Sequence, residues 1–187
     1  MPFTTESEIH EALIARANEI GYPDVATIRH AVFQPGAGAV DVAMFPTEGV
    51  HRLVLIEVTM AADRDSSDKV VGQLMKYYSH ALLLSIEGLE RYREFALNDP
   101  AAARGKTRTN PTKVLGKPND EAWCELKHGR RLRPKEIALF VAFNGDVSPV
   151  LRQIITVLHL HHNLRIGAIR VDDDGSANVL AGAHLTN

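Results

Sequence analysis

Disulfides and membrane spans are the first features that this sequence lacks. Cys124 is the single cysteine among 187 residues, so no disulfide can form within the chain, and we expect a reducing compartment. The longest apolar runs fall far short of the roughly 20 residues that a membrane helix needs, so we expect no membrane partner. The first residues lack a basic stretch followed by an apolar one, so we expect no cleaved signal peptide and a cytoplasmic location.

Several catalytic signatures are also missing from the sequence. It has no Gly-x-Ser-x-Gly nucleophile elbow, no phosphate loop of the Gly-x-x-x-x-Gly-Lys type and no dinucleotide-binding fingerprint. Hydrophobic residues make up 45% of the chain and charged residues 24%, which is the average composition of globular proteins rather than of disordered or fibrous ones. The length predicts one domain over residues 1–187.

Charge is unevenly distributed along the chain, although the net charge is only −2. Residues 101–135 carry ten basic side chains and three acidic ones, whereas residues 1–100 carry eight and fifteen. The basic segment is also rich in glycine, proline, threonine and asparagine, so we expect a basic, loop-rich insertion at 101–135. Such a segment attracts a phosphate backbone, because each neutralised phosphate releases counterions. A solvated surface loop is the alternative.

The hydrophobic pattern predicts alternating helices and strands. The capping-box pattern Thr5-x-x-Glu8 begins a helix that we expect to stop at Gly21. We further expect strands at 25–33, 40–45, 52–59, 137–143, 165–171 and 178–180, and helices at 66–81, 89–97 and 148–162. This order predicts an α/β fold, a three-layer-like sandwich around a central mixed β-sheet.

Two acidic residues stand inside apolar strands. Asp41 lies in Val-Asp-Val and Glu57 in Ile-Glu-Val. If the two strands form an antiparallel hairpin centred on position 49, each acid lies eight residues from the centre, so the two become cross-strand partners with Cβ atoms ~5 Å apart. Two carboxylates that close in a poorly hydrated site need a cation between them, and hard oxygen ligands suit Mg²⁺ or Mn²⁺. In a shifted register, one acid would instead reach solvent or an arginine.

Together with a following helix that contains Gln73 and Tyr77, these acids resemble the PD-(D/E)xK nuclease superfamily. In that superfamily an Asp and the Glu of a Glu-x-Lys strand hold the metal, the lysine activates the attacking water, and some branches add a Gln-x-x-x-Tyr helix. The resemblance covers about residues 5–85 and implies a restriction endonuclease-like core. It further implies that Asp41, Glu57 and the Val58 carbonyl hold Mg²⁺ or Mn²⁺ for phosphodiester hydrolysis.

The motif lysine is replaced here by Thr59. Some members of the superfamily take the lysine from the following helix, where Lys69, Gln73 and Lys76 share one stripe. We therefore predict that a lysine of this helix completes the site; the alternative is the solvated flank of an amphipathic helix. Glu8 could add a ligand, as in resolvase-like branches, although the capping box already explains this residue.

The resemblance implies a metal-dependent nuclease acting on DNA, with RNA as a substrate and a homodimer both left open. The basic residues expected to hold nucleic acid are Arg104, Lys106, Arg108, Lys113, Arg130, Arg131 and Arg133. One alternative is a nuclease-fold protein that has lost catalysis at Thr59 and serves as a module that binds nucleic acid or protein. Another is an unrelated α/β protein whose basic segment binds a protein partner.

Overall fold

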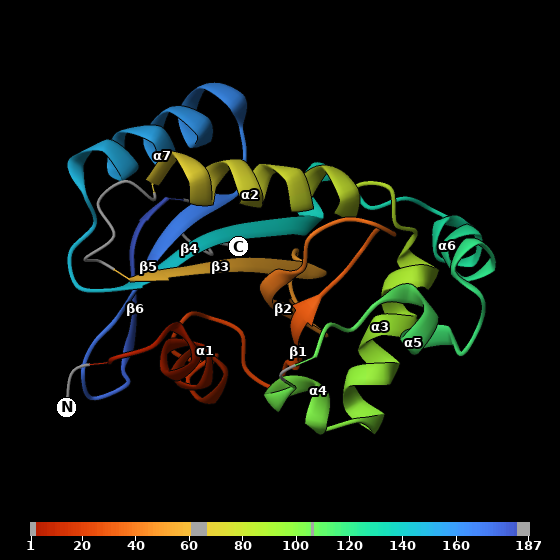
Figure 1. Cartoon of the computed structure of the whole chain (residues 1–187). Coiled ribbons are helices and arrows are strands. Elements are labelled where there is room, and N and C mark those ends of the chain that lie inside the picture. Colours follow the sequence, from red (N-terminus) through yellow and green to blue (C-terminus); the bar gives the residue numbers. More distant parts are fainter. Residues whose placement is uncertain (1–2, 61–66, 106, 183–187) are drawn as a thin grey trace.

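Six strands form a single mixed sheet in the order β1-β2-β3-β4-β5-β6 (Figure 1). The computed structural model describes residues 3–60, 67–105 and 107–182. The strands are β1 (Ala26–Ala31), β2 (Val40–Phe45), β3 (Leu53–Met60), β4 (Ile137–Asn144), β5 (Ile166–Val171) and β6 (Ala177–Gly182). Strands β3, β4 and β5 run parallel, and the other neighbouring pairs are antiparallel. The predicted α/β fold with a mixed sheet is therefore confirmed.

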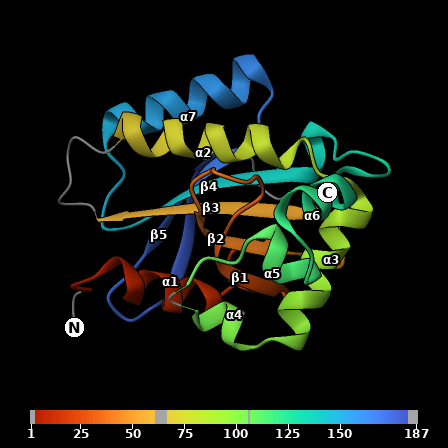
Figure 2. The ribbon, with the colours of Figure 1, turned by 45° about the vertical axis from the view of Figure 1, so that its right-hand side comes forward.

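Helices lie on both faces of the sheet (Figures 1 and 2). The helices are α1 (Glu6–Ala15), α2 (Ser67–Ala81), α3 (Ile86–Asn98), α4 (Ala101–Arg104), α5 (Pro111–Leu115), α6 (Asn119–Lys127) and α7 (Pro149–His162), with a 3-10 turn η1 (Pro134–Glu136). Helix α1 covers one face, α2 and α7 cover the other, and α3 to α6 gather near β1. Two cores result: Ile9 packs with Ile56 on the α1 face, and Leu74 packs with Leu55 on the α2 face. A closer match to a restriction endonuclease-like core stays a prediction.

Strand β3 lies inside the sheet and is buried along its length. Leu53 and Leu55 belong to the core on the α2 face, whereas Val54, Ile56 and Val58 belong to the core on the α1 face. This two-sided burial was predicted from the nearly continuous apolar sequence of the strand. The same burial places the Glu57 carboxylate in an interior strand of the sheet.

The basic segment at 101–135 is largely helical, so the prediction of a loop-rich insertion was wrong. It contains α4, α5, α6 and η1. Helix α5 begins at Pro111 after an Asn110 cap and ends at Gly116, whose positive φ of 65° closes the helix. The proline and glycine that indicated a loop are the start and stop of this short helix. A short stretch of the same segment runs beside β1, where Thr109 bridges Ala31.

Most other element boundaries match the prediction, with α1 as the main exception. Thr5 and Glu8 form the predicted capping box. The helix ends at Ala15 rather than Gly21, and the chain then continues in turns, although Ile20 still reaches the core. No helix in the described ranges has both the length and the apolar character needed to cross a membrane. A single domain and a cytoplasmic location stay predictions.

Candidate functional site

Asp41 and Glu57 meet where the ladder between β2 and β3 ends. The last pairs of that ladder are Ala43 with Leu55 and Val42 with Ile56, which is the predicted register. One residue further on, the Asp41 N–H donates to Glu57 Oε1 at 3.1 Å, and the Val58 N–H donates to Asp41 Oδ2 at 2.9 Å. Side-chain oxygens thus replace the next backbone partners, and both carboxylates are held at the same point of the sheet.

Burial controls the electrostatics of this pair. Glu57 is only 4% exposed, whereas the Asp41 side chain keeps 22% of its surface. Burial raises the pKa of Glu57 to about 9, and the nearby Asp41 charge contributes to the rise. Glu57 therefore keeps its proton near neutral pH unless a cation stabilises the charged form. A divalent cation between the two acids would do so.

The backbone of Val58 adds a third oxygen to this arrangement. The N–H and C=O of one residue in a strand point toward the same neighbouring strand. Because the Val58 N–H points toward Asp41 on the β2 side, its carbonyl faces the same side. Two carboxylates and one backbone carbonyl form an oxygen donor set, which suits Mg²⁺ or Mn²⁺.

Two buried residues behind Asp41 were not predicted from the sequence. His10 of α1 and Arg29 of β1 are 4% and 5% exposed. Arg29 Nη2 lies 3.0 Å from His10 Nδ1, and because arginine can only donate, Nδ1 must accept. The neutral ring then carries its proton on Nε2, which lies 3.8 Å from Asp41 Oδ2. His10 is thus oriented toward Asp41 by Arg29, which also contacts Ser7 and Glu11 of α1.

His30 completes a row of ionisable residues across the sheet. Arg29 pairs with Val42 and Ala31 with Val40, so His30 is level with Asp41. Its φ of +54° is left-handed, which interrupts the regular alternation of side chains in β1. The His30 ring packs edge-on against His10 with centroids 5.7 Å apart. Burial lowers the pKa of His30, and the Asp41 charge opposes that effect.

Of the predicted helix residues, Tyr77 is one on which the charges of both acids act. Burial, followed by the charges of Glu57 and Asp41, raises the pKa of Tyr77 to about 12. Its ring lies so close to the loop that leads into β2 that a Cβ added at Gly38 would collide with the Tyr77 hydroxyl. Gln73, one turn earlier on α2, is partly buried.

The lysines of α2 are the predicted replacements for the missing motif lysine. Lys69 and Lys76 are both exposed on α2. Burial lowers the pKa of His80, and the Lys76 charge lowers it further, which places this lysine beside His80. Thr59, at the motif position, is buried with 8% of its surface exposed. The role predicted for a lysine of α2 therefore stays a prediction.

Glu8, the predicted additional ligand, is held by its own capping box. Its Oε2 accepts hydrogen bonds from the N–H groups of Thr4 and Thr5 at 2.7 and 2.9 Å. These bonds lower the pKa of Glu8. Glu6 is the acid of α1 whose charge acts on Glu57, where it raises the pKa. Glu6 lies one turn before His10. This i, i+4 spacing is the signal in the sequence that would have indicated both residues.

The predicted nucleic-acid residues fall into two groups. Arg104 and Arg108 are exposed near β1. The Arg108 charge adds to the lowering of the His30 pKa and opposes the raising of the Tyr77 pKa. Lys113 lies 5.4 Å from the centroid of the Phe95 ring. The second group, Arg130, Arg131 and Arg133, precedes η1 and β4 at the start of the parallel strands. Lys106 lies outside the described residues.

Arg130 and its neighbours interact with a local acid. Arg130 binds both carboxylate oxygens of Glu136 at 2.9 and 3.2 Å, and the Arg133 N–H donates to the same carboxylate. These contacts lower the pKa of Glu136 despite its partial burial. The acid in turn lies beside Arg52, just before β3. This part of the basic segment therefore has a structural role at the opposite end of β3 from Glu57.

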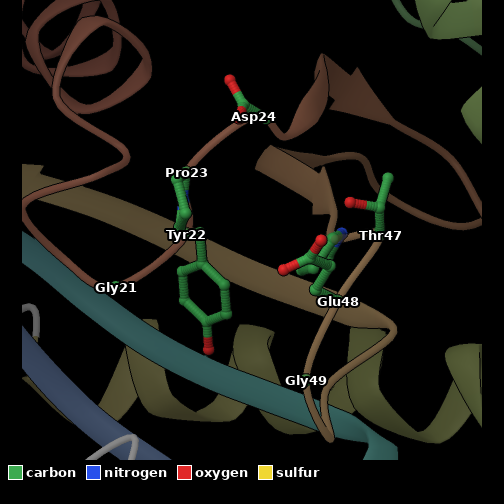
Figure 3. A pocket seen from close by; sticks show the side chains of 8 residues that line it. Gly21, Tyr22, Pro23, Asp24, Thr47, Glu48 and Gly49 are labelled. Atoms are coloured by element: carbon green, nitrogen blue, oxygen red, sulfur yellow. The ribbon is translucent and has the colours of Figure 1, made fainter.

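A pocket of about 320 Å³ lies between the loop before β1 and the turn after β2 (Figure 3). The Tyr22 ring and the Glu48 side chain lie on facing sides of it. Tyr22 is buried, and its hydroxyl lies 3.1 Å from His51 Nδ1. Because β2 begins near Asp41 and ends at this pocket, the cavity lies at the opposite end of the strand from the acid pair.

Comparison with known proteins adds no identification. No protein-family model, curated protein or solved structure matches the chain significantly. In the part of the chain that the structure describes, no group of three or more His, Cys, Asp or Glu side chains is arranged to hold a metal. The candidate site therefore consists of the Asp41 and Glu57 carboxylates beside the Val58 backbone.

Proposed function

We propose that this chain is a metal-dependent nuclease that hydrolyses phosphodiester bonds of DNA. The observation that carries the proposal is the interlocked acid pair, in which the Asp41 N–H binds Glu57 and the Val58 N–H binds Asp41. A buried carboxylate with a pKa near 9 is costly to ionise, and a cation at this point offsets that cost. Asp41, Glu57 and the Val58 carbonyl are the ligands that we assign to Mg²⁺ or Mn²⁺.

Each neighbouring residue has a separate task in this proposal. Arg29 fixes the tautomer of His10, and His10 points its Nε2 toward Asp41 at 3.8 Å. The Val58 N–H fixes the direction of Asp41 Oδ2. A bound divalent cation supplies Lewis-acid polarisation of the phosphoryl oxygen and lowers the pKa of an attacking water. Tyr77, on which the charges of both acids act, lies on the α2 side.

The test is cleavage of plasmid, linear and branched DNA in Mg²⁺ or Mn²⁺, followed on a gel. We expect cutting that EDTA stops and that Glu57→Ala abolishes. Glu48→Ala, which removes an exposed carboxylate in the turn after β2, is the matched control and should cut normally. As a readout besides activity, Mn²⁺ should raise the melting temperature of the wild type and leave that of Glu57→Ala unchanged, because a ligand of the native state stabilises it.

A second candidate function is a binding module of nuclease fold without catalysis. Thr59 at the motif position favours it, because a hydroxyl supplies no positive charge, and the side chains whose charges raise the pKa of Glu57 are the acids Asp41 and Glu6. Salt-sensitive DNA binding with no metal-dependent cutting would select this candidate over the nuclease. Cutting that survives Glu57→Ala would overturn the site assigned here.

A further inference from the structure

Position 59 supplies no positive charge to the proposed site, and the basic segment approaches that site from another direction. This inference rests on the proposed function and extends it. The buried Arg29 is held by His10, Ser7 and Glu11. Another cation lies on the far side of β1, where residues 107–109 run beside the strand.

The strand registers place Arg108 in line with the acid pair. Thr109 bridges Ala31 in parallel orientation, so Arg108 is level with His30. His30 is level with Asp41 across β1 and β2, and Asp41 is level with Glu57 across β2 and β3. Four neighbouring segments thus present Arg108, His30, Asp41 and Glu57 in one row perpendicular to the strands.

Distance along this row is set by the spacing of strands. Neighbouring strands lie about 4.8 Å apart, so the backbones of Arg108 and Asp41, two strands apart, are separated by roughly 10 Å. An extended arginine side chain spans much of that separation.

The backbone of Arg108 is anchored, whereas its side chain is exposed. The Thr109 N–H donates to the His30 carbonyl at 3.0 Å, and the Val32 N–H donates to the Thr109 carbonyl at 2.8 Å. Thr109 itself is 1% exposed. The neighbouring arginine therefore has a fixed origin and a side chain that can reach a ligand. Its charge already acts on Tyr77 and His30, two residues on which the Asp41 charge also acts.

We propose that Arg108 supplies the positive charge that position 59 lacks, and that its guanidinium binds the phosphate of the DNA backbone beside Asp41 and Glu57. The fork of donors on a guanidinium matches phosphate oxygens in pairs. His30, whose ring separates Arg108 from Asp41 in the row, lines the path between them. The same arginine then contributes to substrate binding and to the stabilisation of charge on the phosphate.

The experiment compares Arg108→Ala with Arg152→Ala, which removes the same charge from an exposed arginine in the first turn of α7. Arg108→Lys, Lys69→Ala and Lys76→Ala complete the set. Cleavage of a labelled linear duplex in Mn²⁺ gives kcat and KM, and fluorescence anisotropy of the same duplex in EDTA gives the affinity. Melting temperatures check that each variant folds.

We expect Arg108→Ala to lower kcat/KM by about 100-fold, the usual effect of removing one donor to a developing oxyanion, with a part of the loss in kcat. Arg108→Lys should recover a part of it, and Arg152→Ala should stay within about threefold of the wild type. Equal effects of Arg108→Ala and Arg152→Ala, or a loss found instead in Lys69→Ala or Lys76→Ala, would overturn the inference and leave the nuclease standing.

The binding measurement separates the two proposals if the wild type does not cut. Weaker duplex binding by Arg108→Ala than by Arg152→Ala would then retain the phosphate contact, while the nuclease itself would be rejected. If the wild type neither cuts nor binds the duplex, both proposals are wrong.

Discussion

At the scale of single residues, Glu57 is the most unusual feature of the chain, because it is a carboxyl group held in an apolar strand. Its Oε1 accepts the Asp41 N–H, a bond that favours the charged form, yet burial raises its pKa to about 9. Desolvation therefore outweighs the hydrogen bond. The consequence is that the metal-free protein loses stability as the pH rises above 4.5, because the unfolded chain releases the Glu57 proton while the folded chain keeps it.

We predict that Glu57→Gln removes a pH dependence of stability. Between the ordinary glutamate pKa of 4.5 and the folded pKa of about 9, the folded state holds more protons on Glu57 than the unfolded state. The stabilising contribution of protonated Glu57 is complete below pH 4.5 and is lost as the pH rises toward 9, by at most about 1.4 kcal/mol per pH unit. Glutamine stays neutral, so the variant should gain on the wild type as the pH rises.

Urea unfolding in EDTA, at pH values from 6 up to the folded pKa of about 9, measures this difference. We expect the free energy of unfolding of Glu57→Gln to rise relative to the wild type by roughly 2 kcal/mol or more over that range. Glu48→Gln, in an exposed turn, should follow the wild type. Parallel curves for Glu57→Gln and the wild type would mean that Glu57 ionises normally in the folded protein.

At the scale of elements, periodicity and turn signals predicted the strands and long helices well. The hairpin centred on residue 49 gave the correct register for Val42 and Ile56, because the turn and the loop length fix the register of a hairpin. The helices α4 to α6 were missed. Each has nine residues or fewer, so an apolar period has too little length to show, and proline and glycine at their ends resemble loop signals.

The acids of the candidate site could be predicted from sequence, but the residues around them could not. Asp41 and Glu57 share a hairpin, whose geometry is local. His10 approaches them only because α1 packs across β3, β4 and β5, which also brings it to Arg29 of β1, and His30 turns toward His10 with a left-handed φ that its sequence does not indicate. Such contacts depend on tertiary packing rather than on the period of a single element.

The contact between α3 and α6 gives a prediction about elements. Gly88 of α3 lies against the Leu126 carbonyl of α6, which also accepts the Ser85 hydroxyl and N–H at 2.9 Å each. A Cβ at Gly88 would collide with that carbonyl, so Gly88→Ala must move one helix, and we expect it to destabilise the protein by about 1–3 kcal/mol.

Gly72 of α2 is the control for this prediction. It is exposed, with no atom within 4 Å of an added Cβ, so Gly72→Ala should stabilise the protein by up to about 1 kcal/mol through helix propensity. Urea unfolding of both variants should show opposite signs. A Gly88→Ala protein as stable as the wild type would show that α3 and α6 can separate at this point without cost.

At the scale of the whole molecule, the fold divides a charge cluster that is continuous in the sequence. Arg104 and Arg108 lie near β1, beside the candidate site, whereas Arg131 and Arg133 lie before β4. Leu53 pairs with Ile137 at that end of the sheet, four residues before Glu57 on β3, which corresponds to about 13 Å along the strand. The net charge of residues 101–135 therefore overstates the positive charge close to the acids.

This division predicts which arginines determine the salt dependence of DNA binding. Removing one side chain that binds a phosphate lowers the slope of log K against log salt by about 1. We expect the double variant Arg104→Ala/Arg108→Ala to reduce the slope by about 1–2, because at least Arg108 binds the DNA backbone. Arg131→Ala/Arg133→Ala removes equal charge from the other end of β3 and should keep the wild-type slope. Anisotropy titrations of a duplex over a range of salt concentrations give both values, and equal reductions in the two variants would show that DNA extends along the whole basic segment rather than lying at the β1 edge.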